Sequence, residues 1–175
     1  MDMTTDRRLY VLRHAKSSWD DPTQRDEDRQ LAPRGKRAVK LLAEYVERNG
    51  IRPELVLCSP ARRTLETLSG VSPTGDAMIE PELYTATVGE LIERFRRLPP
   101  ETRSAMVIGH NPAMQMLVLR LVRPTPDPDA RLADVRRKFP TGALATLSFA
   151  APWQELSAGC AELSDYVRPK ALQYH

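Results

Sequence analysis

The sequence predicts an α/β fold, a three-layer α/β/α sandwich whose central sheet is mostly parallel. Short apolar runs of strand length take turns along the chain with segments in which apolar residues recur at helical spacing. The first three runs are continuously apolar, as strands covered on both faces of a parallel sheet are. A chain of 175 residues is long enough to bury a core, so a single domain over residues 1–175 is expected.

Four apolar runs are predicted to be strands, and a fifth segment is a weaker candidate because its alternation is imperfect. The four are residues 9–12, 55–58, 105–108 and 143–149, and the fifth is residues 160–167. The last two are expected to form an antiparallel addition to the sheet.

Helical patterns lie between these runs. Residues 33–50 and 87–98 each place their apolar side chains along one face of a helix, and Asn49 followed by Gly50 supplies a stop for the first of them. A further helix is expected in the stretch that follows the strand at residues 55–58.

A helix is also predicted after the strand at residues 105–108. Asn111 is expected to be its N-cap and Pro112 its first residue. The segment that follows, residues 113–122, is apolar nearly all round and should be well buried.

Composition argues against several classes of function. The formal net charge is +3, and no basic run carries interleaved aromatic residues, so nucleic acid is not expected as a partner. No apolar run reaches the length of a membrane span, and no signal peptide is recognisable.

Cys58 and Cys160 lack CxxC spacing and are expected to be reduced core residues of a cytoplasmic protein. Residues 123–130 are interpreted as an exposed loop, and residues 130–138 as a helix with a solvated face.

Polar motifs follow each of the first three predicted strands. The letters RHA follow residues 9–12, SPARRT follows residues 55–58 and GHNP follows residues 105–108. Ligands of open α/β sheets bind at the carboxyl ends of the strands. The histidines and arginines of these motifs, far apart in sequence, are therefore expected to meet in space.

Phosphoryl chemistry suits two histidines beside arginines better than metal binding does. A metal site calls for further ligands, such as a carboxylate or HExxH spacing, and none accompanies these histidines, so no metal or cofactor is predicted. Guanidinium groups grip phosphoryl oxygens, a neutral histidine can attack phosphorus, and a second histidine can stabilise the developing charge. Taken singly, His14 has a structural reading as a buried core residue, and Arg62 and Arg63 have one as surface residues.

The motifs LRHAKSSW, RQLAPRGKRAV, LVLCSPARRTLET and VIGHNPAM together resemble the histidine phosphatase superfamily, and more closely its SixA-type phosphohistidine phosphatases. The resemblance implies a phosphoglycerate mutase-like fold in a small form without large lid insertions. It implies that His14 accepts the phosphoryl group, and that Arg13, Arg63 and His110 bind and stabilise it. Leu31 and Gly35 match a structural signature at the start of the first long helix.

Some positions depart from the family pattern or match it loosely. Ala15 replaces the usual glycine after the histidine. For the general acid used by many members, Glu82 is the candidate and Glu80 the second, with a structural or solvent-facing role for Glu82 as the alternative. Lys16 and Ser17 are candidate phosphoryl contacts, although solvent exposure suits them nearly as well.

The residues predicted to bind substrate also include Asn111, at the start of a helix whose N-terminus favours anions. Short connections imply an open, shallow site, so a phosphorylated protein is the expected substrate. The resemblance implies that its phosphoryl group is carried on a histidine, as phosphohistidine. A small phosphomonoester substrate, or a phospho-ligand binding module without turnover, are the alternatives. Nothing in the sequence demands a dimer, so a monomer is expected.

Overall fold

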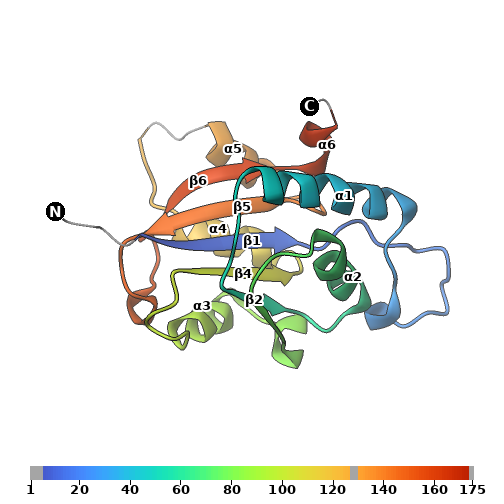
Figure 1. Cartoon of the computed structure of the whole chain (residues 1–175), viewed down its shortest axis with the longest axis horizontal. Coiled ribbons are helices and arrows are strands. Elements are labelled where there is room, and N and C mark those ends of the chain that lie inside the picture. The colour runs from blue at the N-terminus through green and yellow to red at the C-terminus, as the bar shows by residue number, and fades with distance from the viewer. Residues whose placement is uncertain (1–5, 127–129, 174–175) are drawn as a thin grey trace.

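The computed structural model describes residues 6–126 and 130–173, and within these residues six strands form one sheet in the order β3-β2-β4-β1-β5-β6 (Figure 1). The strands are β1 (Arg7–Arg13), β2 (Leu55–Cys58), β3 (Asp76–Ile79), β4 (Ser104–Gly109), β5 (Leu144–Phe149) and β6 (Glu162–Val167). Strands β3, β2, β4 and β1 are parallel, whereas β5 and β6 are antiparallel to their neighbours. The mostly parallel sheet and its antiparallel addition are confirmed.

The helices cover both faces of the sheet. They are α1 (Pro33–Arg48), α2 (Arg62–Val71), α3 (Val88–Arg96), α4 (Ala113–Leu121), α5 (Ala130–Arg137) and α6 (Pro169–Leu172), with short 3-10 helices η1 (Asp26–Asp28), η2 (Pro81–Tyr84) and η3 (Trp153–Glu155). In Figure 1, α1 and α2 lie in front of the sheet and α4 lies behind it. The three-layer arrangement is confirmed.

The two faces of β1 pack into two different hydrophobic clusters, one on each side of the sheet. Successive side chains of a strand point to opposite faces. Tyr10 and Leu12 are buried in the cluster that includes α1, α2 and α6, while Leu9 and Val11 are buried in the cluster that includes α3, α4 and α5. Burial on both faces is the reason why this strand carries an unbroken apolar run.

The structure adds one strand and corrects some boundaries. Strand β3 was not predicted, because its side chains are mostly exposed and it pairs only with β2 at the edge of the sheet. Strand β6 begins at Glu162 rather than at residue 160. Within the predicted loop at residues 123–130, residues 127–129 lie outside the described residues.

The predicted N-cap of α4 is also corrected. The helix begins at Ala113, and Pro112 occupies the N-cap position, so Asn111 stands one residue before the cap. Its side-chain oxygen still accepts a hydrogen bond from the backbone N–H of Gln115 at 3.2 Å. Asn111 therefore supports the first turn of α4 from outside the helix.

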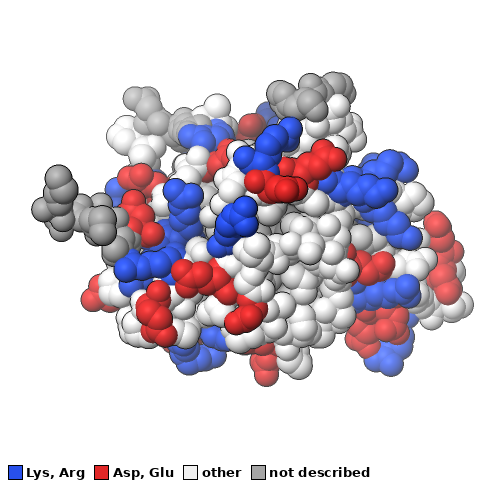
Figure 2. Space-filling model, viewed as in Figure 1, with Lys and Arg blue, Asp and Glu red and all other residues white. Residues whose placement is uncertain are grey.

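The described residues contain no helix that is long and apolar enough to cross a membrane. Both cysteines are free thiols; Cys58 is buried and Cys160 is partly buried. On the face covered by α1 and α2, acidic and basic side chains interleave without a broad field of one sign (Figure 2).

Strands β1, β2 and β4 end at the same edge of the sheet. Arg13 pairs in register with Gly109, and Cys58 pairs with Ile108. The residues that come directly after these strands are His14, Ser59 and His110. The fold thus brings the three strand-end motifs together, as the sequence predicted.

Candidate active site

The two strand-end histidines face each other at the carboxyl edge of the sheet. The ring centroids of His14 and His110 are 5.4 Å apart. Arg63, in the first turn of α2, places its Nη2 atom 3.3 Å from Nδ1 of His110. His14 and Arg63 are both buried. Three of the residues predicted from separate motifs therefore form one cluster.

The loop that leaves β1 is held tightly against the rest of the molecule. The His14 N–H donates to the carbonyl of Gly109, and the Ala15 N–H donates to Oγ1 of Thr67 on α2. Gly35, near the start of α1, approaches the loop so closely that an added Cβ would lie 2.1 Å from the carbonyl oxygen of Lys16. The glycine of the LAPRG motif is therefore required by the packing of α1 against the loop that carries His14.

The hydrogen bond of His14 defines the state of its ring. Nδ1 lies 2.7 Å from the carbonyl oxygen of Ala15, and because a carbonyl only accepts, Nδ1 carries the proton. Nε2 is then the unprotonated nitrogen. Burial, together with the nearby His110, Arg63 and Arg13, lowers the pKa of His14 to about 3 against the opposing effect of the Ala15 carbonyl. His14 is thus a neutral imidazole with a free electron pair at Nε2 near pH 7.

His110 has the opposite tautomer. Its Nδ1 accepts from the guanidinium of Arg63, so Nε2 carries the proton and donates to Oγ of Ser59 at 2.8 Å. Burial lowers the pKa of His110 to about 4, and the charge of Arg63 acts in the same direction. The cluster therefore offers one nitrogen lone pair, on His14, whereas the N–H of His110 is already bound to the Ser59 hydroxyl.

Arg13 adds a second guanidinium to this edge. Its Nη1 donates to the carbonyl of Phe139 at 3.0 Å, which fixes the side chain. Burial lowers the pKa of Arg13, and Arg63 adds to the effect through charge repulsion. Two guanidinium groups that repel each other across a site are well suited to an anion with several oxygens.

Asp26 is the carboxylate that lies in the cluster, and it was not among the residues predicted from the sequence. Its Oδ2 accepts from Nη2 of Arg63 at 3.0 Å, and its backbone carbonyl accepts from Nη1 of the same arginine at 2.7 Å. Arg29 donates to Oδ1 through Nε and Nη2, and the hydroxyl of Tyr84 donates to Oδ2. These donors, Tyr84 foremost, hold the pKa of Asp26 well below its usual range.

Tyr84 closes the other side of the cluster. Its ring stands edge-on to His110, with centroids 5.4 Å apart. Burial raises the pKa of Tyr84, and the Asp26 carboxylate raises it further, so the phenol keeps its proton. Asp26 thus joins η1, α2 and η2 at one point and orients Arg63 toward His110.

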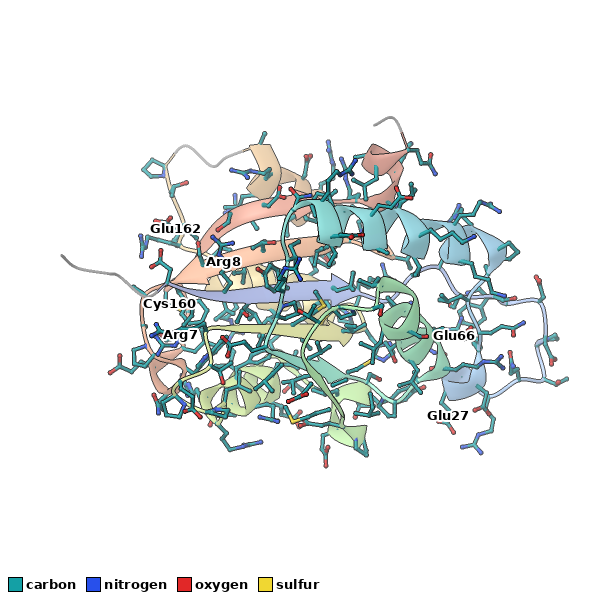
Figure 3. The ribbon with its side chains drawn as sticks, viewed as in Figure 1. Arg7, Arg8, Glu27, Glu66, Cys160 and Glu162 are labelled. Atoms are coloured by element: carbon teal, nitrogen blue, oxygen red, sulfur yellow. The ribbon has the colours of Figure 1, made fainter. Side chains whose placement is uncertain are left out.

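The loop around η1 is anchored to α2 as well. The backbone N–H of Leu31 donates to Oε1 of Glu66 at 3.1 Å. Figure 3 shows Glu66 on α2 at the same end of the molecule as Glu27 of η1, whereas Arg7 and Cys160 lie at the opposite end of β1. The candidate site therefore occupies one end of the sheet.

The structure does not bring the predicted acid candidates into this cluster. Glu82 is exposed and lines a separate hollow together with Glu80 and Arg94. Glu80 is bound by Arg94, whose Nε and Nη2 both donate to its carboxylate. Tyr84, two residues beyond Glu82, is the member of this segment that reaches His110.

The remaining predicted residues surround the cluster. Ser17 is buried and its hydroxyl accepts from Arg29 at 2.6 Å, so it contacts the arginine that holds Asp26. Asn111 donates to the carbonyl of Phe139 at 2.9 Å, which occupies its amide nitrogen. Lys16 is partly exposed, and its backbone carbonyl accepts from the N–H of Ala32.

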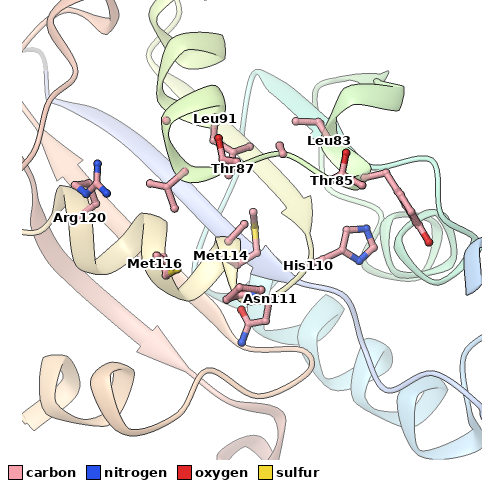
Figure 4. A pocket seen from close by; sticks show the side chains of 15 residues that line it. Leu83, Thr85, Thr87, Leu91, His110, Asn111, Met114, Met116 and Arg120 are labelled. Atoms are coloured by element: carbon pink, nitrogen blue, oxygen red, sulfur yellow. The ribbon is translucent and has the colours of Figure 1, made fainter.

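A hollow of about 490 Å³ begins at His110 and runs between α3 and α4 (Figure 4). Its walls are mostly apolar, and Arg120 lies at its far end. Among the described residues, no group of three or more His, Cys, Asp or Glu side chains is arranged to hold a metal ion. The charged groups described at this edge are guanidinium groups, the partly exposed Lys16 and the Asp26 carboxylate, which Arg63, Arg29 and Tyr84 already bind.

Comparisons with known proteins agree with this geometry. The model of the histidine phosphatase superfamily (branch 1) matches residues 9–90. An uncharacterised protein of Mycobacterium tuberculosis, Rv1276c, is 34% identical over 160 residues, which cover 91% of this chain and 100% of the relative.

Solved structures give the same assignment. A SixA structure from Nakamurella multipartitia is 28% identical with a TM-score of 0.84, covering 94% of this chain and 96% of that chain. A second SixA structure, from Agrobacterium tumefaciens, is 27% identical with a TM-score of 0.75, covering 93% and 98%. Coverage this complete on both sides confirms the small form of the fold. The chain belongs to the histidine phosphatase superfamily and is of the SixA type.

Proposed function

We propose that the protein is a metal-independent phosphatase that forms a covalent phosphohistidine at His14 and acts on phosphohistidine side chains of another protein. The observation that carries this proposal is the hydrogen bond from Nδ1 of His14 to the Ala15 carbonyl, beside Arg63 and His110. It leaves Nε2 as a neutral nucleophile in a cluster that is otherwise made to receive negative charge.

In the first step, the phosphoryl oxygens of the substrate lie against Arg13 and Arg63. The Nε2 lone pair of His14 attacks phosphorus, and the bond between phosphorus and the substrate nitrogen breaks with its electrons going to the leaving imidazole. The guanidinium groups stabilise the charge on the transferring oxygens, and His110 exchanges its hydrogen bond to the Ser59 hydroxyl for one to a phosphoryl oxygen. The leaving imidazole takes up a proton from solvent, so a strong carboxylic acid is not required at this point.

In the second step, water attacks the phosphorus of phospho-His14. The bond between phosphorus and Nε2 breaks, the electron pair returns to His14, and inorganic phosphate leaves with the oxygen of water. The Ala15 carbonyl keeps the proton on Nδ1 throughout, so the ring returns to its starting tautomer.

Asp26 acts as a positioning residue in this scheme. It fixes both terminal nitrogens of Arg63, one through its carboxylate and one through its backbone carbonyl. Orientation of a phosphate-binding arginine before the substrate arrives lowers the reorganisation needed in the transition state. Ser17 acts one contact further out, through Arg29.

Lys16 and Asn111 have more limited parts. The partly exposed Lys16 offers a cation beside the nucleophile, and Asn111 supports the start of α4 rather than the phosphoryl group itself. Glu82, exposed and lining another hollow, does not serve as the general acid.

A protein substrate suits the shape of the site. The cluster lies at an open edge of the sheet, and SixA, to whose structures the chain is similar, carries the name phosphohistidine phosphatase. Free Cys58 and Cys160 suit a reducing compartment, so we also propose a cytoplasmic protein. The whole chain acts as one domain and as a monomer.

The test compares substrates with one enzyme preparation treated with a chelator. Release of phosphate is measured from a phosphohistidine peptide, from p-nitrophenyl phosphate and from a panel of sugar phosphates and nucleotides. The proposal expects metal-free turnover with the highest kcat/KM for phosphohistidine.

Each other outcome points to an alternative. A strong preference for a metabolite makes the protein a small-molecule phosphomonoesterase. Tight phosphate binding without turnover of any substrate makes it a phospho-ligand binding module.

A further inference from the structure

We propose that the hollow between α3 and α4 is a docking groove for the phosphorylated protein, and that it selects a segment with apolar side chains next to the phosphohistidine and an acidic side chain at Arg120. This inference rests on the proposed function and names the kind of protein surface that the same site accepts.

The groove is continuous with the candidate active site. Figure 4 shows His110 at one end and Arg120 at the other, with Met114 and Met116 along α4, Leu91 on α3 and Thr87 at the N-cap of α3. A phosphoryl group held between the two histidines leaves the rest of its carrier at the mouth of this groove.

The floor of the groove is apolar, and its most exposed large apolar side chain is Met116. Met116 exposes 48% of its surface there, whereas Leu91 and Met114 are buried. Methionine is flexible and polarisable, so it adapts to partner side chains of different shape. An exposed apolar side chain in a groove beside a catalytic cluster suits contact with another molecule.

The charged side chains along the groove indicate which kind of protein segment it binds. Among the described residues, no Asp or Glu lines the groove, and its charged residue other than the histidine of the site is Arg120. The side chain of Arg120 is exposed and has no hydrogen-bond or ion-pair partner within residues 6–126 and 130–173, while its backbone carbonyl accepts from the N–H of Gly159. A second hollow continues beyond Met116 and Arg120 and adds Arg136 of α5, again with no acidic residue in the described part of its lining.

The length of the groove favours a protein over a compact metabolite. Ala113 and Arg120 are seven residues apart on one helix, which corresponds to about 10 Å along its axis. A sugar phosphate bound at the histidines does not span that distance, whereas a side chain further along a protein surface does. The complement of the groove is therefore an acidic, partly apolar surface.

The test uses two synthetic phosphohistidine peptides that differ in charge. Both carry leucines on either side of the phosphohistidine; one carries glutamates beyond the leucines and the other carries lysines. For the unmodified protein, kcat/KM is expected to be about fivefold higher for the glutamate peptide, the size expected of one exposed charge pair.

Arg120→Glu should reverse this preference and leave kcat/KM for p-nitrophenyl phosphate within about twofold, because that substrate does not reach the rim. Arg52→Glu is the matched control: Arg52 is likewise exposed but lies before β2, at the other end of the strand, and should leave the preference intact. Met116→Ser, as a second variant, should weaken turnover of both peptides and spare p-nitrophenyl phosphate.

Three results would overturn the inference, and they are distinguishable. Equal rates for both peptides, unaffected by Arg120→Glu, remove the docking groove but leave the phosphohistidine phosphatase in place. Turnover of p-nitrophenyl phosphate without turnover of either peptide removes the proposed substrate as well. A dimer in sedimentation that Arg120→Glu dissociates assigns the groove to a second copy of the chain.

Discussion

The two walls of the candidate active site are built differently. On one side, the loop from β1, η1 and α2 form a network in which Arg29 and Arg63 both bind Asp26. On the other side, α3 and α4 present apolar side chains and an arginine, Arg120, whose side chain has no partner among the described residues. One wall is held together by ion pairs before any ligand arrives, and the other is not.

The difference separates two tasks. Charge that develops at phosphorus in the transition state is best stabilised by groups that are already oriented, and the polar wall supplies them. Recognition of varied protein surfaces is served by an adaptable apolar strip with a single charge at its rim. Mutations in the polar wall should therefore slow every substrate, whereas mutations in the apolar wall should affect protein substrates alone.

The largest expected effect comes from removing the nucleophile. His14→Asn should lower kcat for every substrate by about a thousandfold or more, since the covalent route is lost. Phosphate release from p-nitrophenyl phosphate measures it, and circular dichroism checks that the variant is folded. Activity within tenfold of the unmodified protein would exclude His14 as the nucleophile.

Removal of the Asp26 carboxylate should cause the second-largest fall in kcat. Asp26→Ala frees Arg63 to move, which should lower kcat by about a hundredfold, as misplacement of a positioned group can. KM should stay the same or fall, because a negative charge beside the bound phosphoryl group has been removed. Asp26→Glu should recover part of kcat. A kcat unchanged by Asp26→Ala would show that the polar wall does not depend on this carboxylate.

Packing beneath the polar wall is tested by Gly35→Ala. The added methyl group meets the Lys16 carbonyl, so the free energy of unfolding should fall by about 1–3 kcal/mol and kcat should fall with it. Denaturation in urea measures the first quantity. Gly89→Ala, where a Cβ meets nothing within 4 Å, is the matched control and should be neutral or slightly stabilising.

The two buried histidines should make stability sensitive to acid. The pKa values of His14 and His110 are about 3 and about 4 in the folded chain, below the roughly 6.5 of an unfolded histidine. The unfolded state therefore binds more protons between these values, and stability should fall as the pH drops from about 7 toward 4, by up to about 1 kcal/mol per histidine per pH unit.

Thermal unfolding at pH 7, 5.5 and 4.5 measures this loss. Since carboxylates add a loss of the same sign, the informative quantity is the difference between the unmodified protein and His14→Asn, which should lose less stability. Parallel curves for the two proteins would mean that His14 is not held neutral by burial.

The smallest effect is expected at Glu82. Glu82→Gln should keep kcat/KM within about twofold for p-nitrophenyl phosphate and for the phosphohistidine peptides, since surface substitutions away from a site are usually close to neutral. Steady-state kinetics measure it. A large loss of kcat/KM seen only with the sugar phosphates and nucleotides would instead indicate that Glu82 is the general acid for small phosphomonoesters.

The sequence predicted the centre of the site because strand ends are visible in it. Apolar runs located β1, β2 and β4, and the motifs after them supplied His14, Arg63 and His110. The edge strand β3 was missed because its exposed side chains carry no apolar pattern.

Asp26 was missed for a different reason. It lies in a polar segment without periodicity, and tertiary packing alone brings it to Arg63, 37 residues later. Glu82 was the candidate, with Glu80 second, because many members of the resembling superfamily use a carboxylate in this segment, and no role was predicted for Tyr84. Glu82 and Tyr84 are two residues apart in η2, a 3-10 helix with three residues per turn, so their side chains point in different directions. Tyr84 is the one turned toward His110.

The central claim is that His14 carries the phosphoryl group through its Nε2 atom. Rapid mixing with a phosphohistidine peptide, quenching in base and mass spectrometry of peptides test it directly, since phosphohistidine survives alkaline conditions. We expect phosphate on the peptide that contains His14, assigned to Nε2 by phosphorus NMR, and none with His14→Asn. Full turnover with phosphate never found on His14, or found there on Nδ1, would contradict the account.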